Sequence, residues 1–163
     1  MAGGLDDERL TTAGLFFEAH AALIRALEQA LEAEAGLTGQ WFEILLRLGR
    51  SPSKALRMSD LSAQTALTPS GLTRAVDRLE DAGLVCRKSC PEDRRGAFAT
   101  LTPAGRARIE AAVDAHLAHL DEYFFAHLTA RERAQLEAIT RKLRDQLHPG
   151  ATQLTGCPVP PAD

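Results

Sequence analysis

A threonine–proline pair occurs twice in this chain, at 68–69 and at 102–103, each time directly before a run with helical periodicity. A threonine side chain caps the first helical turn, and proline suits the first helical position because no backbone N–H is needed there. Between these two helix starts lie two short runs that suit strands, Leu84-Val-Cys-Arg-Lys88 and Ala97-Phe-Ala-Thr-Leu101, around a polar stretch. The pattern predicts a β-hairpin held between two helices.

Apolar residues at helical spacing predict four further helices outside that segment. They start near residues 12, 38, 59 and 129, with Thr38 and Ser59 as expected caps and a loop at 51–53. The sequence Thr129-x-x-Glu132 is a capping box, in which each side chain bonds the backbone of the other residue. This last helix is predicted to end near Leu147.

The resulting order of four helices, a hairpin and two helices predicts a mainly α fold, a winged helix-turn-helix with long N- and C-terminal dimerisation helices. The outer helices carry apolar stripes that one winged helix cannot cover, so we expect a homodimer, with a compact monomer as the alternative. We expect a flexible N-terminal tail at residues 1–11 and a flexible proline-containing C-terminal tail at residues 148–163. Between the tails we expect dimerisation helices at 12–36 and 103–147, and the winged helix-turn-helix lobe at 38–101.

The composition is that of one soluble domain, since 45% of the 163 residues are hydrophobic and 25% are charged. No run approaches the ~20 apolar residues that a membrane span needs. The acidic segment 1–8 lacks the basic and apolar regions of a signal peptide. We therefore expect a cytoplasmic protein with no membrane partner.

The charge distribution is uneven, although the net charge is −3. Residues 50–108 hold eleven Lys/Arg and six Asp/Glu, so this segment is +5, whereas the remainder has eight basic and sixteen acidic residues and is −8. A basic middle between acidic ends predicts one surface that faces phosphates.

The helix predicted after Thr68 has one apolar stripe and one polar face. The stripe is predicted to face the core and consists of Leu72, Val76 and Leu79. The polar side chains face outward and are Ser70, Thr73, Arg74 and Asp77, with Arg78 on the flank. Short hydroxyl side chains and arginine suit a helix in the major groove, because they bond base edges and phosphates. The alternative is an ordinary solvated helix.

The loop of the hairpin supplies a second basic element. Its charged side chains are Arg87, Lys88, Glu92, Asp93, Arg94 and Arg95. A wing beside a recognition helix lies over the minor groove, where the negative potential attracts arginine. Asp93 would hold Arg95 or the loop backbone in place. The alternative is a solvated turn.

Together these segments resemble the MarR family. The resemblance is carried by Met58 to Val85, by Pro91-Glu-Asp-Arg-Arg-Gly96 with the family's Asp-x-Arg wing signature, and by Leu101-Thr-Pro-Ala-Gly105. It extends over about residues 12 to 147. It implies a triangular homodimer that binds a pseudo-palindromic double-stranded DNA operator, usually as a repressor.

The resemblance also implies a role for each matching position. Ser70, Thr73 and Arg74 would read the major groove, and Arg78 would support a phosphate contact. Arg95, held by Asp93 beside Arg94, would enter the minor groove. The two recognition helices would engage half-sites roughly 34–36 Å apart.

Family members often respond to small aromatic acids, and candidate residues here are Phe16, His20, Trp41, Leu45 and Arg47. In this hypothesis Arg47 pairs with the ligand's anion, and the ligand shifts the protein to a state that does not bind DNA. In the alternative interpretation Phe16, Trp41 and Leu45 are core residues and His20 lies in an interface.

Cys86 and Cys90 lie on either side of Arg87-Lys88-Ser89 in the predicted wing. Nearby cations lower the pKa of a thiol, so oxidation here would distort the wing and make the regulator redox-responsive. The alternative is two incidental thiols.

His116 and His119 share a face of the long helix, near Glu110 and Asp114. Zinc needs about four ligands, so surface or interface histidines are the alternative and no metal site is assigned. The chain has no Gly-rich phosphate loop and no nucleophile elbow, so we expect neither an enzyme nor a cofactor. A winged helix used only for protein contact is a further alternative.

Overall fold

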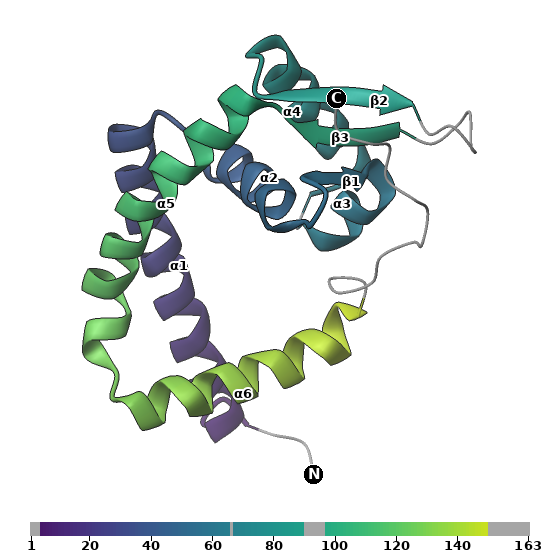
Figure 1. Ribbon diagram of the computed structural model, residues 1–163. Coiled ribbons are helices and arrows are strands. Elements are labelled where there is room, and N and C mark those ends of the chain that lie inside the picture. Colours follow the sequence, from purple (N-terminus) through teal and green to yellow (C-terminus); the bar gives the residue numbers. More distant parts are fainter. Residues whose placement is uncertain (1–3, 66, 90–96, 150–163) are drawn as a thin grey trace.

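The computed structural model describes residues 4–65, 67–89 and 97–149 (Figure 1). It is mainly helical, with one small antiparallel sheet. The elements in chain order are α1 Glu8–Ala35, α2 Gly39–Arg50, β1 Ala55–Arg57, α3 Met58–Gln64, α4 Pro69–Asp81, β2 Val85–Ser89, β3 Ala97–Leu101, α5 Pro103–Tyr123, the 3₁₀ turn η1 Phe125–His127, and α6 Ala130–Leu147.

Most of the predicted helix starts are confirmed. Thr38, Thr68 and Thr102 each cap a helix by accepting a hydrogen bond from a backbone N–H one turn on. Thr129 and Glu132 form the complete capping box at the start of α6. These positions were predictable because a cap depends on only a few neighbouring residues.

Two predicted helix starts are wrong. The first helix begins at Glu8, four residues before the expected Thr12, because the Asp7 side chain accepts from the Arg9 N–H and caps it. Residues 8–11 are therefore helical and do not belong to a tail. Ser59 does not cap α3, because β1 leads directly into this helix, which follows Arg57 without a side-chain cap bond.

The predicted hairpin is confirmed, but the sheet has a third strand. β2 and β3 pair antiparallel, and β1 pairs with the other edge of β3, giving the order β1-β3-β2. Sequence analysis missed β1 because three residues are too few for an alternating pattern to stand out. The partner strand β3, more than forty residues away, defines it.

The core lies almost entirely in the lobe formed by α2, α3, α4 and the sheet. The side chains that lie fully buried there include Ile44, Leu45, Leu48, Leu61, Leu72, Val76, Leu79, Val85 and Phe98. The long helices α1 and α5 run side by side (Figure 1) and bury Leu27, Leu31, Ile109 and Ala112. No residue of α6 is buried within the part of the chain that the structure describes.

α5 leaves the lobe through a tight junction. Thr102 Oγ1 donates to Gly83 O at 2.7 Å, and the Thr102 N–H donates to Leu84 O. A Cβ atom on Gly105 would lie 1.9 Å from Leu84 O, so only glycine allows this approach. The junction therefore fixes how the lobe meets the long helices. Among the described helices, none is both long and apolar enough to cross a membrane.

Candidate DNA-binding interface

The helix α4 has the two faces that its sequence predicts. Its buried side chains are Leu72, Ala75, Val76 and Leu79, which pack into the lobe core. The exposed side chains include Ser70, Thr73, Arg74, Asp77 and Arg78. In Figure 1, α4 lies beside β2, on the side of the lobe away from α6. The polar face of α4 is therefore open to a large partner.

Hydrogen bonds fix the orientation of the hydroxyl side chains in the first turns of α4. Thr68 Oγ1 accepts from the Gly71 N–H at 3.2 Å and lies 3.4 Å from Ser70 Oγ. Thr73 Oγ1 donates to Pro69 O at 2.9 Å, so its own lone pairs remain available. These groups, with the N–H groups of a helix N-terminus, form a polar surface suited to phosphate and base edges.

Arg74 and Arg78 are exposed on this face. Within the described residues, neither guanidinium has an ion pair or a side-chain hydrogen bond. A guanidinium without an internal partner can form two parallel hydrogen bonds to a guanine edge or a phosphate. Of the predicted site residues, Ser70, Thr73, Arg74 and Arg78 thus lie together on one helix face.

The other predicted DNA contacts lie on the wing tip. Asp93, Arg94 and Arg95 belong to residues 90–96, outside the described residues. The strands on either side of this segment pair from Val85↔Leu101 to Ser89↔Ala97. The predicted placement of the tip beside α4 stays a prediction.

Arg87 lies in β2, within the predicted strand 84–88, and not in the hairpin loop to which its charge was also assigned. Its guanidinium pairs with Asp77 and Glu80 of α4. Pairing with two carboxylates makes Arg87 a contact inside the lobe. Sequence patterns missed this because the three residues come together only when β2 packs beside α4.

Cys86 is a free, half-buried cysteine in β2, opposite Thr100 of β3. Its proposed redox partner Cys90 lies outside the described residues. The redox hypothesis therefore stays a prediction.

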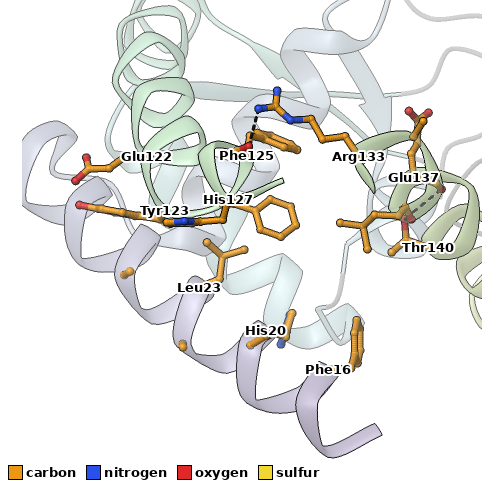
Figure 2. Close-up of a pocket in the computed structure, with 16 residues that line it drawn as sticks. Phe16, His20, Leu23, Glu122, Tyr123, Phe125, His127, Arg133, Glu137 and Thr140 are labelled. Carbon is orange, nitrogen blue, oxygen red and sulfur yellow. Dashed lines mark hydrogen bonds between the residues drawn. The ribbon is translucent and has the colours of Figure 1, made fainter. Parts of the chain in front are cut away.

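The five candidate effector residues are not brought together. Phe16 and His20 line a cavity of about 1360 Å³ between α1, η1 and α6. Figure 2 shows both side chains directed from α1 toward the space beside Thr140. Leu45 is fully buried in the lobe, Trp41 packs on the core, and Arg47 pairs with Glu43 at 3.6 Å. Leu45 thus lies in the core and Trp41 packs against it, as the alternative interpretation predicts, but that interpretation is wrong for Phe16, whose side chain is exposed.

A second cavity, of about 300 Å³, lies where α5 passes α2 and the sheet, and sequence analysis missed it. Its apolar wall is formed by Leu46, Leu101, Ile109 and Val113, and its charged side chains are Arg50, Lys54, Arg106, Glu110 and Asp114. Lys54 donates to Gly49 O, and Arg106 pairs with Glu110 at 2.8 Å. Arg50 has no ion pair among the described residues. No motif marks the site, because its residues come from separate elements.

The two histidines of α5 contact different neighbours. The His116 ring lies 4.5 Å from the ring of Phe42, and burial, followed by the nearby His119, holds the pKa of His116 below its usual value of 6.5. His119 bonds Glu34 at 2.9 Å and stacks on Tyr123. Within the described ranges, no group of three or more potential metal ligands forms. Both histidines thus contribute to the packing of α5.

A helix-turn-helix followed by a hairpin wing, with an open polar recognition helix, defines the class of winged-helix DNA-binding proteins. A sequence model of the MarR family matches residues 35–96. The HTH-type transcriptional repressor Rv2887 of Mycobacterium tuberculosis is 34% identical over 125 residues, which is 75% of this chain and 86% of that protein.

Two solved structures extend the similarity over the whole fold. The crystal structure of Sco3205, a MarR family transcriptional regulator from Streptomyces coelicolor in complex with DNA, is 31% identical. It superposes with a TM-score of 0.85 over 94% of this chain and 96% of that chain. Bordetella bronchiseptica BpsR, whose DNA binding is regulated by 6-hydroxynicotinic acid, is 26% identical. It superposes with a TM-score of 0.73 over 83% of this chain and 99% of that chain.

The chain belongs to the MarR family, and the resemblance in its sequence is confirmed. It is a transcriptional regulator that binds DNA, and not an enzyme.

Proposed function

We propose that this protein is a homodimeric repressor that binds a pseudo-palindromic operator and leaves it when a small aromatic acid binds. The observation that carries the proposal is the polar face of α4, where Arg74 and Arg78 lie exposed beside Ser70 and Thr73. Base-specific contact requires side chains of this kind on a helix whose opposite face is held by a core.

The long helices support the homodimer. Large apolar side chains stay exposed on α1, α5 and α6, and they are Leu10, Leu15, Phe16, Phe17, Ile24, Leu117, Tyr123, Ile139, Leu143 and Leu147. An exposed apolar surface on this scale is typical of an interface between chains. Two of these residues, Phe16 and Tyr123, also line the cavity between α1 and α6 (Figure 2). In the homodimer, the long helices of the second chain would fill this cavity.

A two-fold dimer presents two copies of α4. We propose that Ser70, Thr73 and Arg74 read the major groove and that Arg78 bonds phosphate. Arg95, held by Asp93 beside Arg94, would enter the minor groove. The two helices would then engage half-sites roughly 34–36 Å apart on chromosomal DNA in the cytoplasm.

The cavity between α2 and α5 is the better candidate for the effector. Its volume of about 300 Å³ lies at the lower end of the range for small-molecule sites, and it combines an apolar wall with the cation of Arg50. A ligand carboxylate would pair with Arg50 while its ring contacts Leu46 and Val113. Because α5 leaves the lobe here, an occupied cavity would change the angle between lobe and long helices, and with it the spacing of the α4 pair.

Titration of a fluorescent duplex of the chain's own upstream DNA, beside a scrambled duplex, tests the proposal. We expect tight binding to the first alone, falling by about a thousandfold or more between roughly 50 and 200 mM salt. Equal affinity for both duplexes would contradict operator recognition.

A panel of aromatic acids added to the same complex tests the effector. Release by one compound is expected to need a higher concentration in Arg50→Ala. The matched control is Arg47→Ala, since Arg47 lies on the same helix but does not line the cavity. Release that is equally weakened in both variants would move the effector site elsewhere.

A further inference from the structure

The C-terminal half of α4 is acidic, although α4 is the helix proposed to enter the groove. Asp77, Glu80 and Asp81 follow Arg74 within two turns. Carboxylates this close to DNA lie within the Debye length of about 8 Å at physiological salt, so they repel phosphates unless a cation neutralises them. A recognition helix with this sequence needs a nearby positive charge from another element.

Arg87 of β2 supplies that charge. Its Nη1 atom lies 2.5 Å from Asp77 Oδ1 and 2.9 Å from Glu80 Oε2. The backbone N–H of Arg87 donates to the other carboxylate oxygen of Glu80, Oε1, at 2.8 Å. Glu80 therefore bonds both the side chain and the main chain of one strand residue. One arginine thus bridges two carboxylates and ties the edge strand of the sheet to α4.

The same guanidinium also reaches the backbone of the recognition helix. Arg87 Nη2 donates to Thr73 O at 3.2 Å. Thr73 and the adjacent Arg74 are proposed base readers, and Thr73 Oγ1 bonds Pro69 O one turn earlier. Arg87 is therefore hydrogen-bonded to the helical turn whose position decides where these side chains meet the bases.

This network differs from an isolated surface ion pair. The Arg87 side chain is only 27% exposed, against 38% for Glu80 and 51% for Asp77. Exposed pairs contribute little, but a guanidinium held by several charge-assisted bonds is fixed in orientation. A lysine ammonium lacks the planar fork needed to reach Asp77, Glu80 and Thr73 O at once.

We propose that Arg87 is a positioning residue for operator recognition. It fixes α4 against the wing strand at the turn that carries Thr73 and Arg74, and it neutralises Asp77 and Glu80 so that the acidic half of α4 tolerates DNA. This inference rests on the proposed reading of an operator by α4. Arg87 itself makes no contact with phosphate in this account.

The first test compares Arg87→Gln with wild type on operator and scrambled duplexes across a salt series. We expect operator affinity to fall at least tenfold and the preference over scrambled DNA to shrink. The slope of log affinity against log salt stays unchanged, because no phosphate contact is lost. Arg78→Gln is the contrasting variant, since the dimer then loses one proposed phosphate contact per chain and the magnitude of the slope should fall by about 1.8, which is about 0.9 for each of two contacts. Unchanged operator affinity in Arg87→Gln, or a similar fall in the magnitude of its slope, would overturn the proposal.

Two further variants separate neutralisation from anchoring. Arg87→Lys keeps the charge but not the fork, so we expect partial retention of affinity with reduced preference. The triple variant Arg87→Gln, Asp77→Asn, Glu80→Gln also removes the two carboxylates that Arg87→Gln leaves unpaired. Relative to Arg87→Gln, it should recover affinity for scrambled DNA, but it should not recover the preference for the operator over scrambled DNA. Full wild-type preference in the triple variant would show that Arg87 does not position α4.

Amide hydrogen exchange tests the clamp without DNA. Arg87→Gln should raise exchange in α4 relative to α5, with circular dichroism showing the helical content kept. Unchanged exchange in α4 would refute the clamp even if the wild type binds its operator. If wild type fails to prefer the operator while exchange in α4 rises, the proposed function fails and the clamp stands.

Discussion

The DNA-binding lobe and the long helices differ in how well one chain covers its own apolar side chains. In the lobe, Leu45, Leu48 and Leu79 are fully buried by helices and strands of the same chain. On the long helices, Leu15, Phe17 and residues of α6 stay largely exposed. The lobe therefore has a complete core of its own, whereas the long helices need a second surface. Changes to the lobe core should unfold the chain, and changes to the long helices should separate two chains.

The largest effect is expected in the lobe core. Leu48→Ala removes a side chain with no exposed surface and should lower the free energy of unfolding by about 2–5 kcal/mol. Urea denaturation measures this change. Leu5→Ala is the control, because Leu5 is 96% exposed and its loss should matter by less than about 0.5 kcal/mol. Equal effects would mean that the lobe core does not hold the fold.

The next effect should appear on the long helices. Leu143→Asp places a charge on the apolar face of α6 and should raise the dimer dissociation constant about 100-fold, or about 2.7 kcal/mol. Analytical ultracentrifugation measures it. Ala138→Asp is the matched control, since position 138 lies about 140° around the helix from position 143. A dimer that tolerates Leu143→Asp, or no dimer in wild type, would contradict the proposed interface.

The junction between the two regions gives a third test. Gly105→Ala drives a methyl group into Leu84 O and should destabilise the protein by about 1–3 kcal/mol. Gly14→Ala, in the second turn of α1 with nothing within 4 Å, should stabilise it by about 0.5–1 kcal/mol. Thermal melts of the two variants should shift in opposite directions. A shift of the same sign would show that the close approach at Gly105 relaxes freely.

The smallest effect concerns pH. Because the pKa of His116 is lower in the folded protein than its usual 6.5, the unfolded chain binds more protons as the pH falls below that value. Stability is therefore full above about pH 6.5 and declines as the pH drops through the lowered pKa. His116→Phe should flatten this decline in melting temperature, whereas His148→Gln at the end of α6 should not. An unaltered decline in His116→Phe would assign it to other groups.

The fold was predictable from sequence wherever a few neighbouring residues decide the structure. The Thr-Pro helix starts, the capping box at Thr129 and the buried stripe of α4 are local patterns of this kind. The strand β1 and the uncapped start of α3 were not predictable, because β3 determines β1 and β1 leads into α3.

The residues of the candidate sites were likewise predictable only where local spacing decides their position. Ser70, Thr73, Arg74 and Arg78 were placed from helical spacing alone, because exposure follows from the opposite buried stripe. The partners of Arg87 and the cavity beside Arg50 depend on contacts between elements distant in sequence, and no spacing encodes them. The five effector candidates were chosen by residue type, which does not determine whether side chains share one cavity.

The central claim is that two copies of α4 read one operator, and a stoichiometric titration of the upstream duplex with wild type and Arg74→Ala tests it most directly. We predict two wild-type chains per duplex, and for Arg74→Ala a preference over scrambled DNA that is lower by about tenfold or more, since a bidentate base contact contributes about 1–3 kcal/mol. One chain per duplex, or the same preference in both proteins, would contradict the account.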